Sequence, residues 1–305
     1  MVKFPMGLVI RQMREYLGMT REELAGTVMT VPNLCKVERG QIVPKPENLE
    51  YLCGRLGLSI NSMSAIPLDG EMMLIQQLKD DLDISLVDGD VLKAEELIST
   101  LKSYEKFTTN KLEKQYLLAA EISLLSKTSG NSQEILEKIE QALRTTHKNF
   151  HESTIESIFL SKNEFRLLIL LATQYRRIGK TDKAIAVLYG LKNNMDSYLQ
   201  YDNVEKGKRY PTTIFNLTNA LGDMGNERLD EIIELCDLGH SVCLETEHLR
   251  MLPNIVFNKA IALAKKEKLA ESTKLMKQVY YTCELYNMDA ELIKQYALDE
   301  GIVLE

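Results

Sequence analysis

The chain has 305 residues, 45% hydrophobic and 27% charged, which is the composition of a globular protein that can bury a core. No run approaches the roughly 18 apolar residues that a membrane helix needs, and the first residues lack the apolar core of a secretory signal, so the sequence excludes a membrane protein and favours the cytoplasm. The five cysteines are odd in number and scattered, which favours reduced thiols over a disulfide framework.

Charge is unevenly distributed along the chain. The formal net charge is −7, yet residues 1–66 hold eight Lys and Arg against six Asp and Glu, a balance of +2, which leaves −9 for the remainder. A mildly basic N-terminal segment (the head, residues 1–66) followed by an acidic remainder (the body) is typical of a protein whose head binds the phosphates of nucleic acid. Because the imbalance is small, it supports a nucleic-acid-binding head only together with a recognisable motif.

Capping residues and apolar spacing predict four short helices in residues 10–58. Thr20 and Glu23 have the spacing of a capping box, which starts the second helix. Thr30 is the N-cap of the third helix, and a leucine repeat over 49–56 predicts the fourth. These short, closely spaced helices predict a compact helical domain.

The third predicted helix has an inner and an outer face. Leu34 and Val37 point inward, which leaves Val31, Asn33 and Lys36 pointing outward. The third helix is therefore expected to bury one face and to expose the other.

This stretch resembles the lambda-repressor-like (XRE-type) helix-turn-helix family over roughly residues 7–66, most specifically in Thr-x-x-x-Leu-Ala at 20–25 and Leu-x-x-Val-Glu-x-Gly at 34–40. The resemblance implies that the third helix lies in the major groove of DNA. It also assigns Glu38 to a structural pair with Arg14. The DNA-binding residues that it implies are Arg21, Thr30, Val31, Asn33, Lys36, Arg39 and Lys45.

Two departures and one alternative accompany this resemblance. Arg21 stands where the family usually has Gln, and Pro32 replaces a polar residue in the recognition helix. A helical bundle that binds protein instead of DNA is the alternative interpretation. The coincidence of helix caps, small Ala25 and motif spacing favours DNA binding.

Beyond residue 66 the sequence is helical in pattern, without strand alternation or a glycine-rich phosphate loop. We expect an all-α protein with a helix-turn-helix domain over 1–66, a linker helix over 67–83 and a repeat domain over 84–305. The repeat domain is predicted to contain about five helical pairs and a closing helix, near 84–106, 110–146, 160–195, 211–246, 253–287 and 288–304.

Two internal similarities predict helical repeats. The pattern Phe-Asn-x-x-x-Ala-Leu starts at Phe215 and again at Phe257, 42 residues later. The segment around Tyr175, Gly179 and Ala184 resembles a tetratricopeptide (TPR) repeat, because these residues fall at the offsets of that motif. The resemblance implies a right-handed TPR-like superhelix in which the first helix of each pair lines a concave groove.

Asn216 and Asn258 occupy the same register in adjacent repeats. A side-chain amide can satisfy one donor and one acceptor of an extended peptide backbone. The alternative, that each Asn is merely a tolerated polar residue on its helix, remains open from the residues alone. The predicted peptide-binding residues are Phe215, Asn216, Asn219, Asn258 and Lys259.

The combined layout resembles the peptide-pheromone-responsive regulators of Gram-positive bacteria, typified by PlcR, PrgX, NprR and Rgg, with PlcR closest. The resemblance implies a cytoplasmic homodimer that binds a double-stranded DNA operator and is controlled by an imported quorum-sensing oligopeptide. In that family, asparagines on the first helices hold the peptide backbone in the concave groove. Leu170, in the corresponding register of the third repeat, departs from this pattern.

Two other function classes are the alternatives to a peptide-controlled regulator. The main one is a helix-turn-helix repressor whose TPR-like domain binds a protein partner, such as an antirepressor. No catalytic constellation indicates an enzyme, and no cofactor is expected. His147 with His151, and Cys236 with His240 and Cys243, have helical spacings that could bind metal, but neither set surrounds an ion, so no metal site is predicted.

Overall fold

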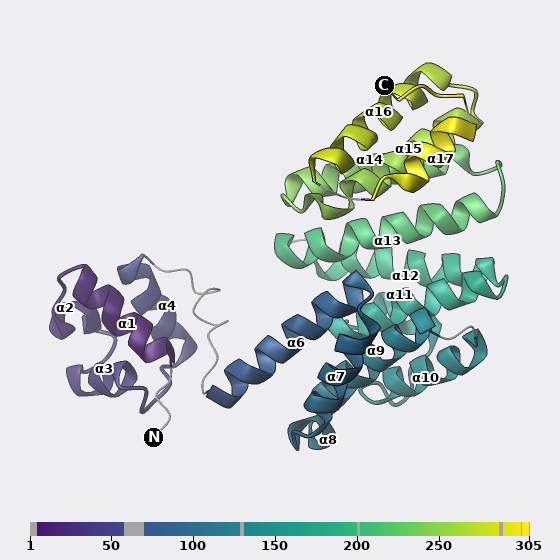
Figure 1. Cartoon of the computed structure of the whole chain (residues 1–305). Helices are drawn as coiled ribbons and strands as arrows, with labels where there is room; N and C mark the ends of the chain where they lie inside the picture. Colours follow the sequence, from purple (N-terminus) through teal and green to yellow (C-terminus); the bar gives the residue numbers. More distant parts are fainter. Residues whose placement is uncertain are drawn as a thin grey trace. The chain divides into compact units, whose positions relative to one another are not determined.

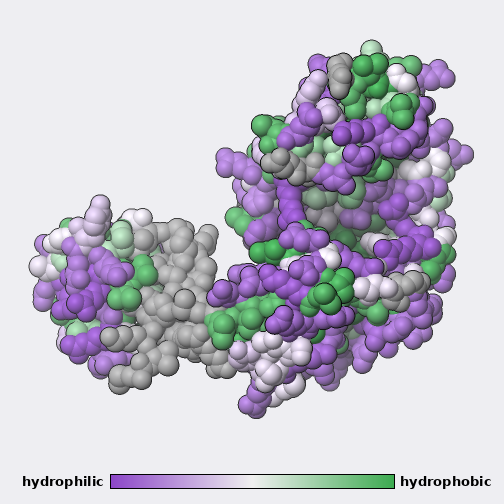
Figure 2. Space-filling model, viewed as in Figure 1, coloured by the Kyte–Doolittle hydropathy of each residue, from purple (hydrophilic) through white to green (hydrophobic). Residues whose placement is uncertain are grey.

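The computed structural model describes residues 5–57, 70–128, 131–199, 202–286, 289–299 and 301–304, and in these residues the regular secondary structure is entirely helical. Contacts divide the chain into two compact units, Met1–Ser103 and Tyr104–Glu305. The predicted all-α fold is confirmed. No helix in the described ranges is long and apolar enough to cross a membrane, and hydrophilic side chains cover much of the face that Figure 2 shows.

The first unit contains six described helices (Figure 1): α1 (Pro5–Tyr16), α2 (Arg21–Ala25), α3 (Val31–Glu38), α4 (Pro46–Leu56), α6 (Gly70–Asp88) and α7 (Val91–Lys102). Helices α1 to α4 enclose a core that includes Ile10, Leu24, Leu34 and Leu52, whose side chains are fully buried. Helix α1 approaches α3 so closely that a Cβ atom on Gly7 would lie 2.0 Å from the carbonyl oxygen of Val37.

Helices α6 and α7 pack against each other as a pair. The turn between them falls at Gly89, whose positive φ of 79° favours glycine, and at Asp90, whose side chain accepts a hydrogen bond from the amide of Lys93 at the start of α7. The structure therefore differs from the expected linker helix over 67–83 and first pair over 84–106. Helix α6 continues to Asp88 without a break because the turn-forming residues come only after it.

The second unit is a row of helical pairs. Its helices are α8 (Lys106–Thr109), α9 (Lys111–Thr128), α10 (Ser132–Arg144), α11 (Lys162–Arg177), α12 (Thr181–Tyr198), α13 (Asn203–Asp223), α14 (Leu229–Glu245), α15 (Leu252–Lys265), α16 (Leu269–Leu285) and α17 (Glu291–Asp299). Two 3-10 helices, η1 (Glu152–Ser157) and η2 (Leu249–Met251), lie in the connections before α11 and α15. Helices α11 to α16 stack in chain order, each against the next (Figure 1).

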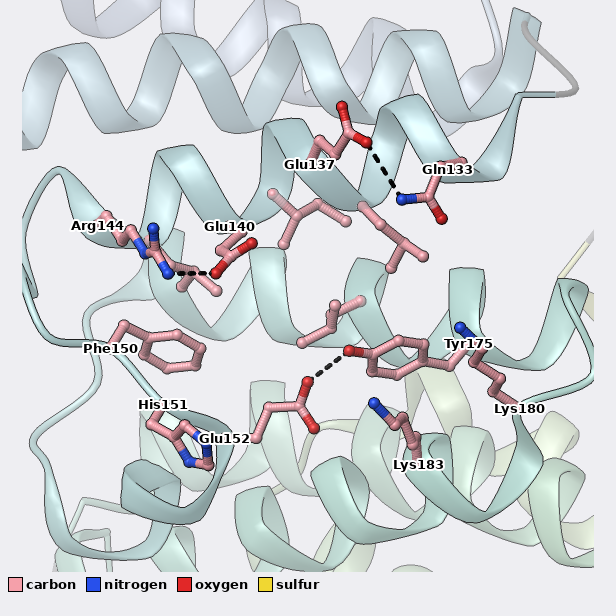
Figure 3. Close-up of a pocket in the computed structure, with 14 residues that line it drawn as sticks. Gln133, Glu137, Glu140, Arg144, Phe150, His151, Glu152, Tyr175, Lys180 and Lys183 are labelled. Atoms are coloured by element: carbon pink, nitrogen blue, oxygen red, sulfur yellow. Dashed lines mark hydrogen bonds and ion pairs between the residues drawn. The ribbon is translucent and has the colours of Figure 1, made fainter.

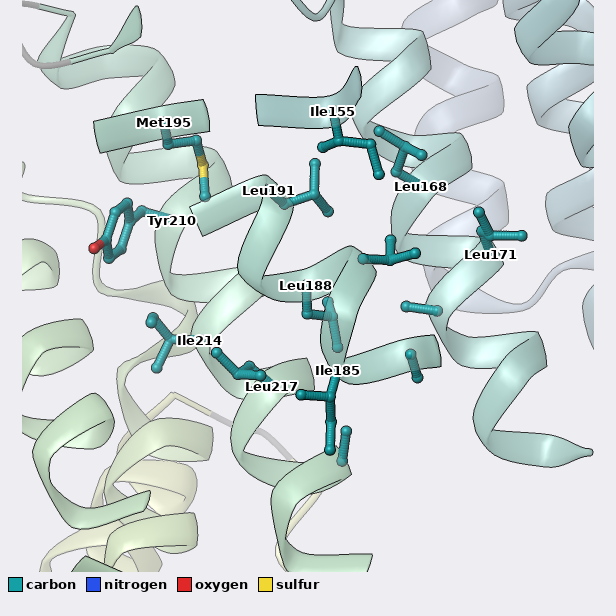
Figure 4. Packing of buried hydrophobic residues seen from close by; sticks show 14 of the residues in the cluster. Ile155, Leu168, Leu171, Ile185, Leu188, Leu191, Met195, Tyr210, Ile214 and Leu217 are labelled. Carbon is teal, nitrogen blue, oxygen red and sulfur yellow. The ribbon is translucent and has the colours of Figure 1, made fainter. Parts of the chain in front are cut away.

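One apolar core runs from α9 to α15, and a second cluster joins α15, α16 and α17. Figure 4 shows Leu188 and Leu191 of α12 between Leu168 of α11 and Leu217 of α13, and all four side chains are fully buried. Each large apolar side chain that this packing removes from water contributes roughly 1.5–3 kcal/mol to the stability of the fold. The first helices of these pairs, α11, α13 and α15, also contact one another in chain order.

Candidate functional site

The outer face of α3 carries the predicted base-reading residues. Thr30 is the N-cap residue, and its side chain makes no capping hydrogen bond, so its hydroxyl remains available. Asn33 and Lys36 are exposed, whereas Val31 is half-buried and packs against the domain core. Leu34 is buried, so α3 separates an inner apolar face from an outer polar one.

The remaining predicted DNA contacts flank α3. Arg39 is the C-cap residue of α3 and Lys45 is the N-cap residue of α4, and both side chains are exposed. Arg21 lies at the start of α2 with 38% of its side chain exposed. Together with the outer face of α3, these cations can meet a phosphate backbone on both sides of the helix that would read bases.

Glu38 joins two arginines inside this domain. It accepts hydrogen bonds from Arg14 Nε at 2.5 Å and Nη2 at 3.2 Å, which confirms the predicted structural pair. It also accepts a hydrogen bond from Arg21 Nε at 2.7 Å, a contact that the sequence did not predict. The hydrogen bond to Glu38 raises the pKa of Arg14, although burial opposes it. Arg21 therefore stabilises the domain through its hydrogen bond to Glu38, and its remaining N–H donors stay available to solvent.

A second site lies between α13, α14 and α15, with Arg176 of α11 at its border. Asn258 of α15 is 8% exposed, and its Nδ2 donates to Thr218 Oγ1 at 2.9 Å and to Asn219 Oδ1 at 3.0 Å, both on α13. These residues line a pocket of about 200 Å³. Its lining residues are Arg176, Thr218, Asn219, Gly222, Asp223, Leu229, Ile232, Asn258, Ile261, Ala262 and Lys265.

The two asparagines leave a complementary pair of polar atoms. Both hydrogens of Asn258 Nδ2 are used, and so is Asn219 Oδ1. In the part of the chain that the structure describes, Asn219 Nδ2 and Asn258 Oδ1 have no protein partner. One amide thus offers a donor and the other an acceptor, which is the pattern that one residue of an extended peptide presents along its edge.

Charged residues border the same pocket. Arg176 at the end of α11 pairs with Asp223 at the end of α13, with Nε 2.7 Å from Oδ2. Lys265 of α15 lines the pocket as well. These residues and Thr218 were missed from the sequence, because no local pattern marks an ion pair between residues 47 positions apart.

The other predicted peptide-binding residues lie elsewhere. Asn216 is half-buried, donates its Nδ2 to the Thr212 carbonyl of its own helix at 2.8 Å and does not line this pocket. Lys259 forms an ion pair with Asp237 of α14, and Phe215 packs against the core. The structure therefore brings Asn219 and Asn258 together and leaves Asn216, Phe215 and Lys259 outside the pocket.

No group of three or more His, Cys, Asp and Glu side chains in the described ranges is placed to hold a metal ion. His147 instead lies 3.0 Å from the carboxylate of Glu164. Cys236 and Cys243 are buried, and burial raises the pKa of their thiols to about 12 and about 11. Neither spacing singled out in the sequence forms a metal centre.

Residues 5–64 match a family model described as a helix-turn-helix domain. The head is a helix-turn-helix DNA-binding domain. No curated protein matches the chain in sequence. The family match covers the head alone, so the relationship of the whole chain depends on its structure.

Nearly the whole chain is similar to several solved structures. Bacillus thuringiensis PlcR, in complex with the peptide PapR7 and DNA, has a TM-score of 0.69 at 14% identity, over 98% of this chain and 99% of that chain. ComR from S. thermophilus, in complex with DNA and its signalling peptide ComS, has a TM-score of 0.56 at 19% identity, over 97% and 99%. The Streptococcus dysgalactiae SHP pheromone receptor Rgg2 has a TM-score of 0.55 at 14% identity, over 97% and 98%. At these identities the likeness shows the fold, a helix-turn-helix head joined to a helical superhelix.

Proposed function

We propose that this chain is a cytoplasmic transcriptional regulator that binds operator DNA as a homodimer and is controlled by a signalling oligopeptide in the pocket of Asn219 and Asn258. The observation that carries the peptide assignment is the unused donor of Asn219 beside the unused acceptor of Asn258. The structures of PlcR and ComR with peptide and DNA support it, because their fold covers nearly this entire chain.

In this proposal, the peptide-binding unit controls the DNA-binding unit through the homodimer. A homodimer reads two half-sites about one helical turn of DNA apart, roughly 34 Å. A peptide that changes the curvature or pairing of the repeats alters the separation of the two recognition helices. Operator affinity then changes without any change in the base contacts of α3.

DNA binding is tested by selecting preferred duplexes from a random-sequence library with the full chain. Lys36→Ala is expected to weaken binding to the selected duplex by about 1–3 kcal/mol. Lys208→Ala, at an exposed position in the body, is the control and leaves binding unchanged. Equal binding by wild type and Lys36→Ala would remove Lys36 from the readout.

Peptide binding is tested with a library of short linear peptides immobilised for capture of the full chain. Asn219→Ala is expected to reduce affinity for captured peptides, since a lost hydrogen bond costs about 1 kcal/mol. Asn193→Ala, on an exposed position of α12, is the control. Failure of every peptide to capture the chain would contradict the peptide assignment and favour the antirepressor alternative.

A further inference from the structure

A cavity of about 460 Å³ lies in the second unit, between α10 and the start of α12. This volume is in the range of small-molecule sites, roughly 300–1,000 Å³. Figure 3 shows side chains from α10, from residues 150–152, from the end of α11 and from the start of α12 converging on it. The cavity has no part in the proposed DNA or peptide contacts.

Part of the cavity wall is apolar. Leu136 and Ile139 of α10, Leu171 of α11 and Phe150 line it. Leu136 and Phe150 are only half-buried, so apolar surface remains open to a ligand. Removing such surface from water favours an occupant with an aliphatic or aromatic body.

The acidic groups of the cavity already have partners. Glu140 pairs with Arg144 at 2.5 Å, and Glu137 accepts a hydrogen bond from Gln133 at 3.2 Å. Glu152 accepts a hydrogen bond of 2.5 Å from the hydroxyl of Tyr175. Burial and this carboxylate raise the pKa of Tyr175, so the hydroxyl stays protonated and keeps Glu152 occupied.

The cavity also has two lysines, whose side chains are exposed. Lys180 and Lys183 lie beside Tyr175 in Figure 3, and neither forms an ion pair among the described residues. Lys183 only places its Nζ 5.5 Å from the centre of the Tyr175 ring. Lys180 is also the N-cap residue of α12, an 18-residue helix whose first amides no side chain caps. The exposed Lys180 and Lys183 side chains and the start of α12 therefore give this border of the cavity positive charge that no ion pair among the described residues neutralises.

We propose that this cavity binds a small amphipathic anion. Its carboxylate or phosphate group lies between Lys180 and Lys183 at the start of α12, and its apolar body lies on Leu136, Ile139, Leu171 and Phe150. This site is independent of the proposed peptide pocket and holds whether or not the peptide assignment is correct.

Isothermal titration calorimetry of the full chain with three ligands of one chain length tests the proposal. Octanoate and octyl phosphate carry the two anionic groups, and octylammonium reverses the charge. We expect saturable binding of at least one anion and much weaker binding of octylammonium, and the tighter anion identifies the preferred group. No saturation by either anion up to roughly 10 mM, or equal binding of octylammonium, would overturn the proposal.

Matched lysine variants locate the bound anion. Lys180→Ala and Lys183→Ala are each expected to weaken binding of the anion about tenfold. Lys268→Ala is the control, because Lys268 is the uncapped N-cap residue of α16 and lies outside this cavity. Equal affinity in Lys180→Ala, Lys183→Ala and wild type would show that the anion binds elsewhere and would reject the site.

Discussion

The amide nitrogen of Asn258 lies 3.0 Å from the amide oxygen of Asn219, so a side-chain hydrogen bond joins α15 to α13 beneath the candidate peptide pocket. The same nitrogen donates to Thr218. These two bonds fix the orientation of the amides that line the candidate pocket. Such preorganisation lowers the ordering cost of binding.

The hydrogen bond between Asn219 and Asn258 is expected to give a measurable interaction energy in a double-mutant cycle. Asn219→Ala and Asn258→Ala together should cost less stability than the sum of the single changes, with an interaction energy of about 0.5–3 kcal/mol by urea unfolding. Asn216→Ala combined with Asn258→Ala is the control, because Asn216 bonds only to its own helix. Additive effects in the first cycle would mean that the bond contributes nothing to stability.

Loss of Arg14 should destabilise the helix-turn-helix domain. Arg14→Ala leaves Glu38, whose side chain is 1% exposed, with Arg21 as its remaining partner. Breaking a buried ion pair costs about 3–5 kcal/mol, so amide hydrogen exchange in α1 and α3 should accelerate strongly in the full chain. Arg11→Ala removes an exposed pair with Glu15 on the same helix and should leave exchange unchanged. Similar exchange in both variants would contradict a structural role for Glu38.

Arg39 and Lys45 are expected to contribute affinity without sequence preference. Each exposed cation that contacts a phosphate adds about one to the slope of log affinity against log salt concentration. Arg39→Ala and Lys45→Ala should therefore lower that slope by about one each, on preferred and on unrelated duplexes alike. An unchanged slope in either variant would remove that residue from the phosphate contacts.

Glu164 should make the stability of the fold decrease at acidic pH. Burial alone would raise its pKa, but hydrogen bonds from Thr146 and Ser161 and the charge of His147 outweigh burial, so the pKa lies below its ordinary value of 4.5. A carboxylate whose pKa is lowered by folding stabilises the fold above its unfolded pKa, and this contribution is lost as the pH falls through the folded pKa. Glu164→Gln keeps the capping geometry and should flatten the fall of Tm below pH 4.5.

Wild type and Glu164→Gln are compared by thermal unfolding from about pH 6 to about pH 3. The variant should have the lower Tm near pH 6, because it lacks the charged hydrogen bonds. Parallel Tm curves over this range would contradict the assignment of acid sensitivity to Glu164.

Thiol reactivity should follow burial. Burial raises the pKa of the Cys236 thiol to about 12 and that of Cys243 to about 11, whereas Cys35 on α3 is partly exposed. The thiolate is the reactive form, so iodoacetamide should alkylate Cys35 well before Cys236 and Cys243 in the native chain. Mass spectrometry after timed quenching measures the order, and urea-unfolded protein, in which all sites react alike, is the control.

Local features of the fold could be predicted because their causes are local. Thr20 and Glu23 form the expected capping box, with the Thr20 amide 2.7 Å from a Glu23 carboxylate oxygen. Gly179 ends α11 with a positive φ of 75°, at its offset in the repeat motif. Each depends on residues within one helical turn, which sequence spacing shows directly.

The candidate site was only partly predictable, because its contacts depend on how helices cross. A hydrogen bond joins Asn219 to Asn258, which follows it by 39 residues. Lys259, the next residue of α15, instead forms an ion pair with Asp237 of α14. The shared register of Asn216 and Asn258 did not place both in one pocket, since Asn216 bonds to its own helix. The 460 Å³ cavity arises from side chains on four segments and has no sequence motif at all.

Tyr175 and Arg176 are consecutive residues of α11, yet Tyr175 lines the larger cavity and Arg176 lines the peptide pocket. The helix α11 thus borders both the candidate peptide pocket and the candidate anion cavity. By thermodynamic linkage, any factor by which an anion in one site changes peptide affinity in the other must equal the factor by which the peptide changes anion affinity. Placed in this way, α11 would let the regulator respond to two signals whose effects are reciprocal.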